Sequence, residues 1–179
     1  SKYGSKCGLS TNGASTDNRF FAQNITGINA NDILYLRCWV KIPAGSNYGN
    51  VLLRADPRNV TNIQLGETTL DTATNTNMWE KLSGIVKMPN TTTNFNFYIR
   101  SQTNPSSGDG AILKLDDAMV INLTSIFGTG KEPGLEYMDK LMGSFYSIFN
   151  TDIKHHDVWV YPEDIGVTTN ENDATSNTT

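Results

Sequence analysis

The stretch ILYLRCWVKI, residues 33–42, alternates between two kinds of side chain along its whole length. The apolar set consists of Leu34, Leu36, Cys38, Val40 and Ile42. The set between them consists of Tyr35, Arg37, Trp39 and Lys41. Because successive side chains of a β-strand point to opposite faces of the sheet, this period of two predicts a strand with one buried face.

Further runs with the composition of strands lie on both sides of this stretch, and turn residues separate them. They cover residues 5–10, 19–25, 51–55, 62–66, 79–88, 94–101 and 111–121. Short strands with turns between them and no long helix predict an all-β fold, an antiparallel β-sandwich of the jelly-roll type.

The last of these runs, residues 111–121, contains a break in its alternation. Leu113 and Leu115 are expected to face the core, but so are Ala118 and Val120, which have the opposite phase. One extra residue in a strand shifts the alternation by one position. We therefore expect a β-bulge at Asp116–Asp117.

After the last strand the sequence changes from strand to helix signals. Thr124 is a candidate N-cap for a single turn that ends at Gly128. A second helix is expected to begin near Pro133 and to end at Gly143, with an apolar stripe formed by Leu135, Met138, Leu141 and Met142. A helix this short is marginally stable by itself. We therefore expect it to pack on the sandwich, over the open end where a first strand is missing.

The chain therefore divides into three parts on sequence alone. Residues 1–123 form the jelly-roll domain and residues 124–143 a short helical extension. Residues 144–179 are expected to be an irregular tail or linker, because the end of the chain is poor in apolar residues.

The composition excludes several classes of partner. The net charge is -4 and Lys and Arg form no cluster, so the basic face of a nucleic-acid binder is missing. No apolar run approaches the roughly 20 residues of a membrane span, and none near Ser1 resembles a secretory leader. We expect no nucleic-acid partner, no membrane insertion and a fragment of a longer chain.

Cys7 and Cys38 are the two cysteines, and both fall in strand-like stretches at positions expected to face inward. Two buried free thiols and one disulfide bond are both compatible with this placement. No Cys or His spacing suggests a zinc site.

The sequence contains no recognisable catalytic constellation, so we expect a protein that is not an enzyme. His155 and His156 are adjacent, and neighbours in a strand point to opposite faces. Asp116 and Asp117 are adjacent too, whereas glycoside hydrolysis needs two carboxyl groups that face each other.

Sugar binding needs an aromatic face for the apolar side of a pyranose ring and polar side chains for its hydroxyl groups. The first candidate face consists of Asn96, Tyr98 and Arg100, with Arg54, Gln64 and Phe20 from neighbouring strands. The rival face, expected on the other sheet, consists of Tyr35, Arg37 and Trp39. Either set could instead pack against loops, the helix or a neighbouring chain, and both alternatives stay open.

The stretches WEKLSGIVKMP, FNFYIRS and AILKLDDAMVI, which begin at residues 79, 95 and 111, resemble in their order the second half of carbohydrate-binding modules of the family 4/9/22 type. ILYLRCWVKI resembles the middle strand of those modules. The resemblance spans roughly residues 3–121 and implies a galactose-binding-like jelly roll. It also implies a structural calcium ion, Ca2+, with Asp116 as one ligand.

The stretch NLTSIFGTGKEPGLEYMDKL, residues 122–141, resembles a segment that follows such modules in tail, baseplate and fibre proteins of phages that infect Gram-positive bacteria. This resemblance implies a non-catalytic receptor-binding module, located in the virion or outside the cell, whose partner is a cell-surface polysaccharide. One alternative is a structural jelly roll for tail-fibre assembly, as a homotrimer or with other tail proteins. Another is an accessory module of a cell-wall hydrolase.

Overall fold

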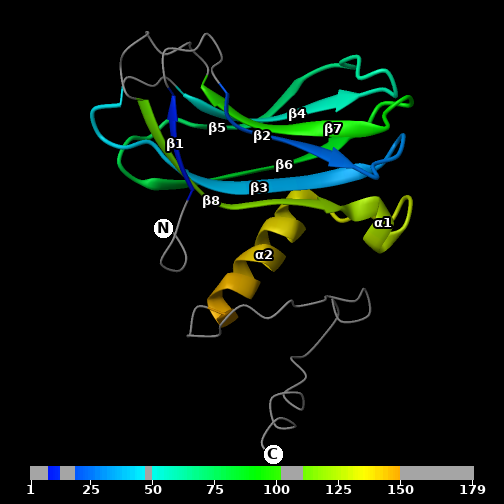
Figure 1. Ribbon diagram of the computed structural model, residues 1–179. Coiled ribbons are helices and arrows are strands. Elements are labelled where there is room, and N and C mark those ends of the chain that lie inside the picture. Colours follow the sequence, from blue (N-terminus) through cyan, green and yellow to red (C-terminus); the bar gives the residue numbers. More distant parts are fainter. Residues whose placement is uncertain (1–7, 13–18, 47–49, 102–110, 150–179) are drawn as a thin grey trace, which may run out of the picture.

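The computed structural model describes residues 8–12, 19–46, 50–101 and 111–149. Within these ranges the chain folds into two antiparallel sheets packed face to face, followed by two helices (Figure 1). The strands are β1 (Gly8–Asn12), β2 (Arg19–Thr26), β3 (Ile33–Lys41), β4 (Val51–Arg58), β5 (Thr68–Ala73), β6 (Trp79–Lys87), β7 (Asn94–Ser101) and β8 (Ala111–Asn122). One sheet has the order β1-β8-β3-β6 and the other β2-β7-β4-β5, so the predicted β-sandwich is confirmed.

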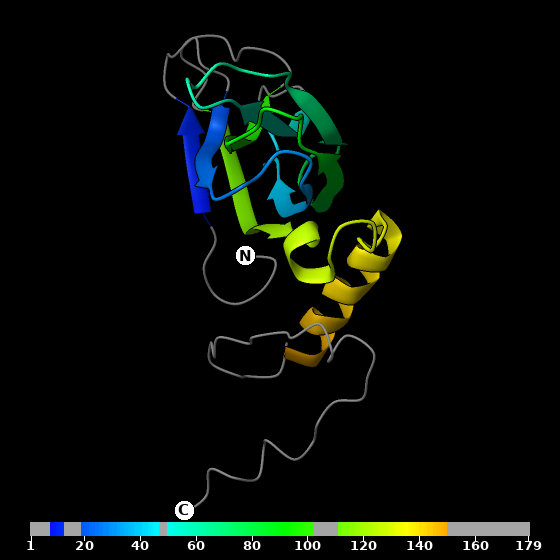
Figure 2. The same ribbon diagram turned by 90° about the vertical axis from the view of Figure 1, so that its right-hand side faces the viewer.

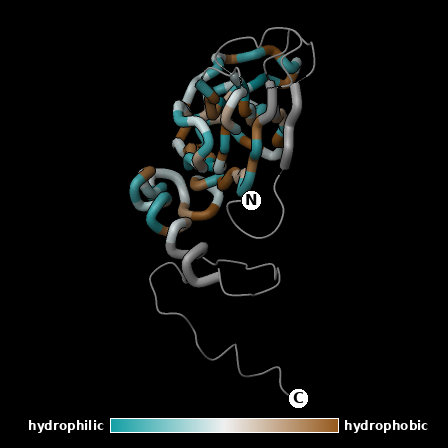
Figure 3. The backbone as a smooth tube through the Cα atoms, turned by 90° about the vertical axis from the view of Figure 1, so that its left-hand side faces the viewer, coloured by the Kyte–Doolittle hydropathy of each residue, from teal (hydrophilic) through white to brown (hydrophobic). Residues whose placement is uncertain are grey.

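The core lies between the two sheets and is built from the alternating residues that the sequence singles out. From β3, Leu34, Leu36 and Cys38 are fully buried, and they face residues such as Leu53 and Phe97 of the opposite sheet. Cys38 is a free thiol in the described part of the chain, and Cys7 lies outside it. Figure 3 shows hydrophobic segments in both layers of the sandwich and again where the helices meet it.

The connection between β4 and β5 differs from the prediction. Residues 62–66 form no strand, because the segment is a tight turn in which the side chain of Asn59 accepts hydrogen bonds from the backbone of Thr61 and Ile63. The strand that pairs with β4 here is β5. It was not predicted, because its sequence TTLDTA is too polar to show an apolar alternation. β4 itself continues through Pro57 to Arg58, three residues beyond its predicted end.

The predicted bulge in β8 is confirmed. Trp39 pairs with Asp116 and Arg37 with Met119, so two steps along β3 correspond to three along β8. Asp117, the residue in the bulge, has a φ of 53°, in the left-handed region that Asp tolerates better than most residues. Leu115 and Val120 both pack against the core, as expected, but the expectation for Ala118 is wrong, because it is exposed.

The two helices are α1 (Leu123–Phe127) and α2 (Leu135–Phe149). The N-cap of α1 is Asn122 and not Thr124: the Asn122 side chain accepts a 3.0 Å hydrogen bond from the backbone N–H of Ser125. Gly128 ends α1 as predicted, but α2 continues through Gly143 to Phe149. No helix in the described ranges combines the length and apolar character that crossing a membrane requires.

The helices pack on the outer face of the β1-β8-β3-β6 sheet and lie below the sandwich in Figures 1 and 2. Their contacts form a second apolar cluster around buried Tyr35, Leu123 and Met138. Ile85 and Met119 complete the cluster from β6 and β8. The expected packing on the sandwich is therefore confirmed, but its expected place over an open end is wrong.

Candidate functional site

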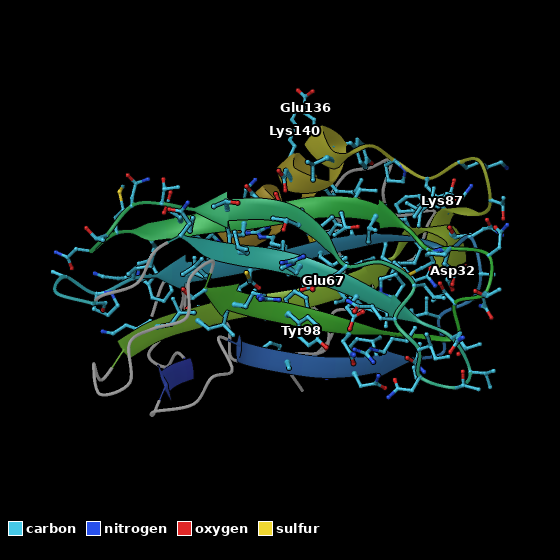
Figure 4. The ribbon with its side chains drawn as sticks, turned by 90° about the horizontal axis from the view of Figure 1, so that it is seen from above. Asp32, Glu67, Lys87, Tyr98, Glu136 and Lys140 are labelled. Carbon is cyan, nitrogen blue, oxygen red and sulfur yellow. The ribbon has the colours of Figure 1, made fainter. Side chains whose placement is uncertain are left out.

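Polar side chains gather on the outer face of the β2-β7-β4-β5 sheet, which no helix covers. The strand register places them in rows across the sheet: Asn24, Asn96 and Asp56 form one row, and Ala22, Tyr98 and Arg54 form the next. We call this surface the polar face; its polar members are Asn24, Arg54, Asp56, Arg58, Glu67, Asn96, Tyr98 and Arg100. Figure 4 looks onto it, with Tyr98 and Glu67 near its centre.

Asp56 is the centre of a hydrogen-bond network in one half of this face. Its Oδ2 accepts from Tyr98 Oη at 3.0 Å, from Asn96 Nδ2 at 3.2 Å and from Arg58 Nε at 2.8 Å. Arg58 also forms an ion pair with it, and this hydrogen-bonded pairing raises the pKa of Arg58. The carboxylate is fully buried, so these donors replace the water that an isolated charge would need.

Glu67 is the centre of the other half. Its Oε1 lies 2.8 Å from Arg54 Nε and 3.1 Å from Arg100 Nη1, so one carboxylate joins two guanidinium groups from adjacent strands. These three side chains keep between 18% and 27% of their surface exposed. They are the charged groups of this half that a ligand can reach.

The polar face therefore brings together four of the side chains predicted for it. Asn96, Tyr98, Arg100 and Arg54 lie side by side on β7 and β4. The role expected of Tyr98 is nevertheless wrong: its side chain is only 6% exposed, because its hydroxyl is turned in toward Asp56. It cannot present an open ring to a sugar.

Two other predicted members lie differently. Gln64 is in the turn after β4, where it forms an isolated bridge with Arg58, so it lies beside one end of the face and not on a neighbouring strand. Phe20 belongs to β2, at a register shift between Arg19 and Phe21, and the placement of its side chain lies outside the described part of the structure.

The rival face lies under and beside α2. Tyr35 is fully buried, and its hydroxyl donates a 2.8 Å hydrogen bond to Oδ1 of Asp139 on the helix. Arg37 is also buried, with its guanidinium 3.4 Å from Asp117 and 6.0 Å from the ring of half-buried Trp39. Two of its three residues are thus closed to a ligand, because the helix and the bulge cover them.

The bulge holds a carboxylate in an unusual environment. Burial raises the pKa of Asp117 to about 6, although the nearby Arg37 guanidinium acts in the opposite direction. Asp116, its neighbour, accepts a hydrogen bond from the Asp117 backbone N–H at 3.0 Å.

The calcium site implied by the sequence resemblance needs several oxygen ligands around Asp116. In the described ranges no group of three or more His, Cys, Asp or Glu side chains is placed to hold a metal ion. The calcium ion therefore stays a prediction, with Asp116 and the early region of the chain as its expected ligands.

Four members of the polar face were missed on sequence: Asn24, Asp56, Arg58 and Glu67. A signal for two of them exists, because Arg54, Asp56 and Arg58 alternate along one strand. Both residues lie beyond residue 55, the predicted end of this strand. Glu67 has no such signal, because it reaches the face from a turn.

No protein-family model matches this chain, and no curated protein matches it in sequence. Similar solved structures include the CBM22-1 xylan-binding domain from Paenibacillus barcinonensis Xyn10C, with 17% identity and a TM-score of 0.49 over 63% of this chain and 69% of that one. The C-terminal domain of EclA, a sugar-binding protein, has 15% identity and a TM-score of 0.44 over 66% and 80%. A family 4 carbohydrate-binding module has 14% identity and a TM-score of 0.46 over 66% and 73%. Likenesses of this size do not establish what this chain binds.

Proposed function

We propose that this chain is a non-catalytic carbohydrate-binding domain and that its ligand lies on the polar face. The observation that supports this best is the register of β2, β7 and β4, which holds amide and guanidinium groups in fixed rows on an uncovered sheet. Side chains already fixed by hydrogen bonds to Asp56 and Glu67 lose little further freedom when a ligand binds. Such groups suit the hydroxyl and acidic groups of a glycan.

The biological setting we propose is a phage tail, baseplate or fibre protein that recognises the cell-surface glycan of a Gram-positive host. The support is the resemblance of residues 122–141 to segments of such proteins. In the structure this segment forms α1, a turn with positive φ at Gly128 and Gly130, and the start of α2.

A structural role in fibre assembly is the second candidate. It is favoured by three apolar side chains around the helices that keep more than a third of their surface exposed, namely Ile126, Leu135 and Tyr137. Such side chains suit a contact with another subunit.

The test is binding of the purified protein to intact Gram-positive cells and to cells stripped of wall polysaccharide. We expect binding that is lost on stripping. Ala22 is exposed on β2, the edge strand of this sheet, opposite Tyr98, so Ala22→Gln should obstruct the ligand without disturbing the core. Lys87→Gln, at an exposed position on β6 of the other sheet, is the matched control.

Two results decide between the candidates. Cell binding that survives both stripping and Ala22→Gln would contradict a glycan ligand on this face. A protein that binds no cells but forms a stable oligomer in solution would favour the structural role.

A further inference from the structure

We propose that the ligand of the polar face is an anionic glycan whose carboxylate or phosphate group is bound by Arg54 and Arg100. This inference rests on the proposed function, because it specifies the chemistry of the same site.

The charges on the polar face are unequal. Arg58 is matched by Asp56, which it contacts through both Nε and Nη2 at 2.8 and 2.7 Å. Among the residues that the structure describes, Glu67 is the carboxylate that pairs with both Arg54 and Arg100. This half of the face therefore has a surplus positive charge, on a chain whose net charge is -4.

The two arginines also have hydrogen-bond donors to spare. Each guanidinium carries five N–H donors. Within the described part of the chain, Arg54 contacts Glu67 through Nε, and Arg100 contacts it through Nη1. Arg100 Nε is buried there with no hydrogen-bond acceptor. Two guanidinium groups that share a single carboxylate are well placed to bind a second oxyanion.

This surface offers fewer favourable contacts to a neutral sugar than to an anionic one. Its main attraction to a protein is the stacking of its apolar side on an aromatic ring, and the ring of Tyr98 is buried against its neighbours. Hydrogen bonds between guanidinium and an ionised group are roughly twice as strong as those between neutral groups. The described side chains therefore favour a charged ligand over a neutral one.

Glu67 would compete with that ligand, because its negative charge already lies against both arginines and occupies one nitrogen of each. Glu67→Gln keeps the size of the side chain and removes its charge. We expect this variant to bind an anionic glycan more tightly, by several-fold, which is the opposite of what loss of an ordinary binding residue does.

The experiment is titration calorimetry of the full chain at low salt with three probes. They are oligogalacturonate, the same oligomer after reduction of its carboxyl groups, and poly(glycerol phosphate). We expect at least one anionic probe to bind at least about tenfold more tightly than the neutral one, with an affinity that falls as salt is added. The first and third probes distinguish a uronate from a phosphodiester.

The variants make the assignment specific. Arg54→Gln and Arg100→Gln should each weaken binding of the anionic probe by about tenfold or more, the loss of a hydrogen bond to a charged group. Lys87→Gln also removes one positive charge, but on the other sheet, so it should leave the affinity unchanged.

Equal affinity for the neutral and anionic probes would overturn this inference and leave the proposed function standing. An affinity for the anionic probe that Glu67→Gln fails to raise would also overturn it, and this test does not depend on whether the arginine variants fold. No binding of any probe, together with cell binding that Ala22→Gln leaves intact, would overturn the inference and the proposed function together.

Discussion

The hydroxyl of Tyr35, on β3, donates a hydrogen bond to the carboxylate of Asp139 on α2, 104 residues further along the chain. Asp139 also accepts from Ser83 Oγ at 3.0 Å and forms an ion pair with Lys81, both on β6. One carboxylate thus fixes the helix to two neighbouring strands. Burial acts to raise the pKa of Asp139, but the hydrogen bonds from Lys81, Tyr35 and Ser83 outweigh it and lower the pKa.

Replacing Asp139 should weaken the docking of α2. We expect Asp139→Asn to lower the free energy of unfolding by about 1–3 kcal/mol, the cost of leaving buried donors without a charged acceptor. Because the folded-state pKa is depressed, the stabilisation is present above the unfolded-state pKa and is lost as the pH falls through the folded-state value. Urea denaturation of Asp139→Asn and of Glu136→Gln, an exposed carboxylate one turn earlier, checks this; equal stabilities would contradict it.

The apolar contact of the helix gives a second prediction. Met138 is 1% exposed whereas its neighbour Tyr137 is 44% exposed. Met138→Ala should therefore cost about 2–5 kcal/mol, and Tyr137→Ala much less than that. Thermal melts of the two variants compare them directly, and a Met138→Ala protein as stable as Tyr137→Ala would mean that α2 does not dock in solution.

Asp117 should make an unusual contribution to the dependence of stability on pH. Its pKa is raised to about 6 in the folded state. The stabilisation that it gives the folded state is therefore fully present below the unfolded-state pKa of about 3.9, and it is lost as the pH rises through 6. The loss amounts to at most about 3 kcal/mol. Asp117→Asn tolerates the same φ of 53° and cannot ionise, so its unfolding free energy should lack this component.

The measurement is chemical denaturation of both proteins between pH 4 and pH 7. The difference in stability between Asp117→Asn and the unmodified protein should shift in favour of Asn as the pH rises, because only the unmodified protein has to ionise this buried carboxyl group. A constant difference would show that the Asp117 carboxyl is not buried in solution.

Gly84 on β6 is expected to tolerate no side chain. A Cβ there would lie 2.6 Å from Cβ of Leu70 on β5, at a point where the two sheets come close. We expect Gly84→Ala to cost about 1–3 kcal/mol, and Leu70→Ala should not rescue it because the clashing atom remains. Gly134→Ala is the control, since nothing lies within 4 Å of its Cβ position. Equal melting temperatures of the two glycine variants would contradict the close approach.

Tyr98 is expected to act on stability through its hydroxyl. Tyr98→Phe removes one of the donors to buried Asp56 and should cost about 1–3 kcal/mol. Tyr137→Phe, at an exposed position, should cost nothing measurable. A Tyr98→Phe protein with unchanged stability would indicate that water satisfies Asp56 in place of the phenol.

The strands with regular alternation could be predicted from the sequence, because β3, β6 and β7 each turn alternate apolar side chains into the core. The sequence predicted one buried face for β3, whereas Tyr35 and Arg37 on its other face are buried too. β5 could not, because its contribution is one buried residue at Ala73 and a close contact at Leu70 in a run of polar residues. Part of the polar face was predictable for the same reason: Asn96, Tyr98 and Arg100 share a phase.

Whether those side chains are exposed or buried could not be predicted from the sequence. Whether Tyr98 is open or buried depends on Asp56, which lies 42 residues earlier and becomes its neighbour only through strand pairing. In the same way, the sequence does not show that α2 packs over Tyr35. From the sequence alone, Tyr35 and Trp39 therefore look like an exposed binding surface.

The extra residue at Asp117 has a consequence for the two ends of β8. Before it, Leu113 and Leu115 face the core and Lys114 and Asp116 face outward; after it, Val120 faces the core and Met119 and Ile121 face α2. An alignment of this chain with a sandwich whose last strand is regular therefore needs a one-residue gap at this point. Without the gap, Met119 and Ile121 would be assigned to the core and Val120 to the helix contact.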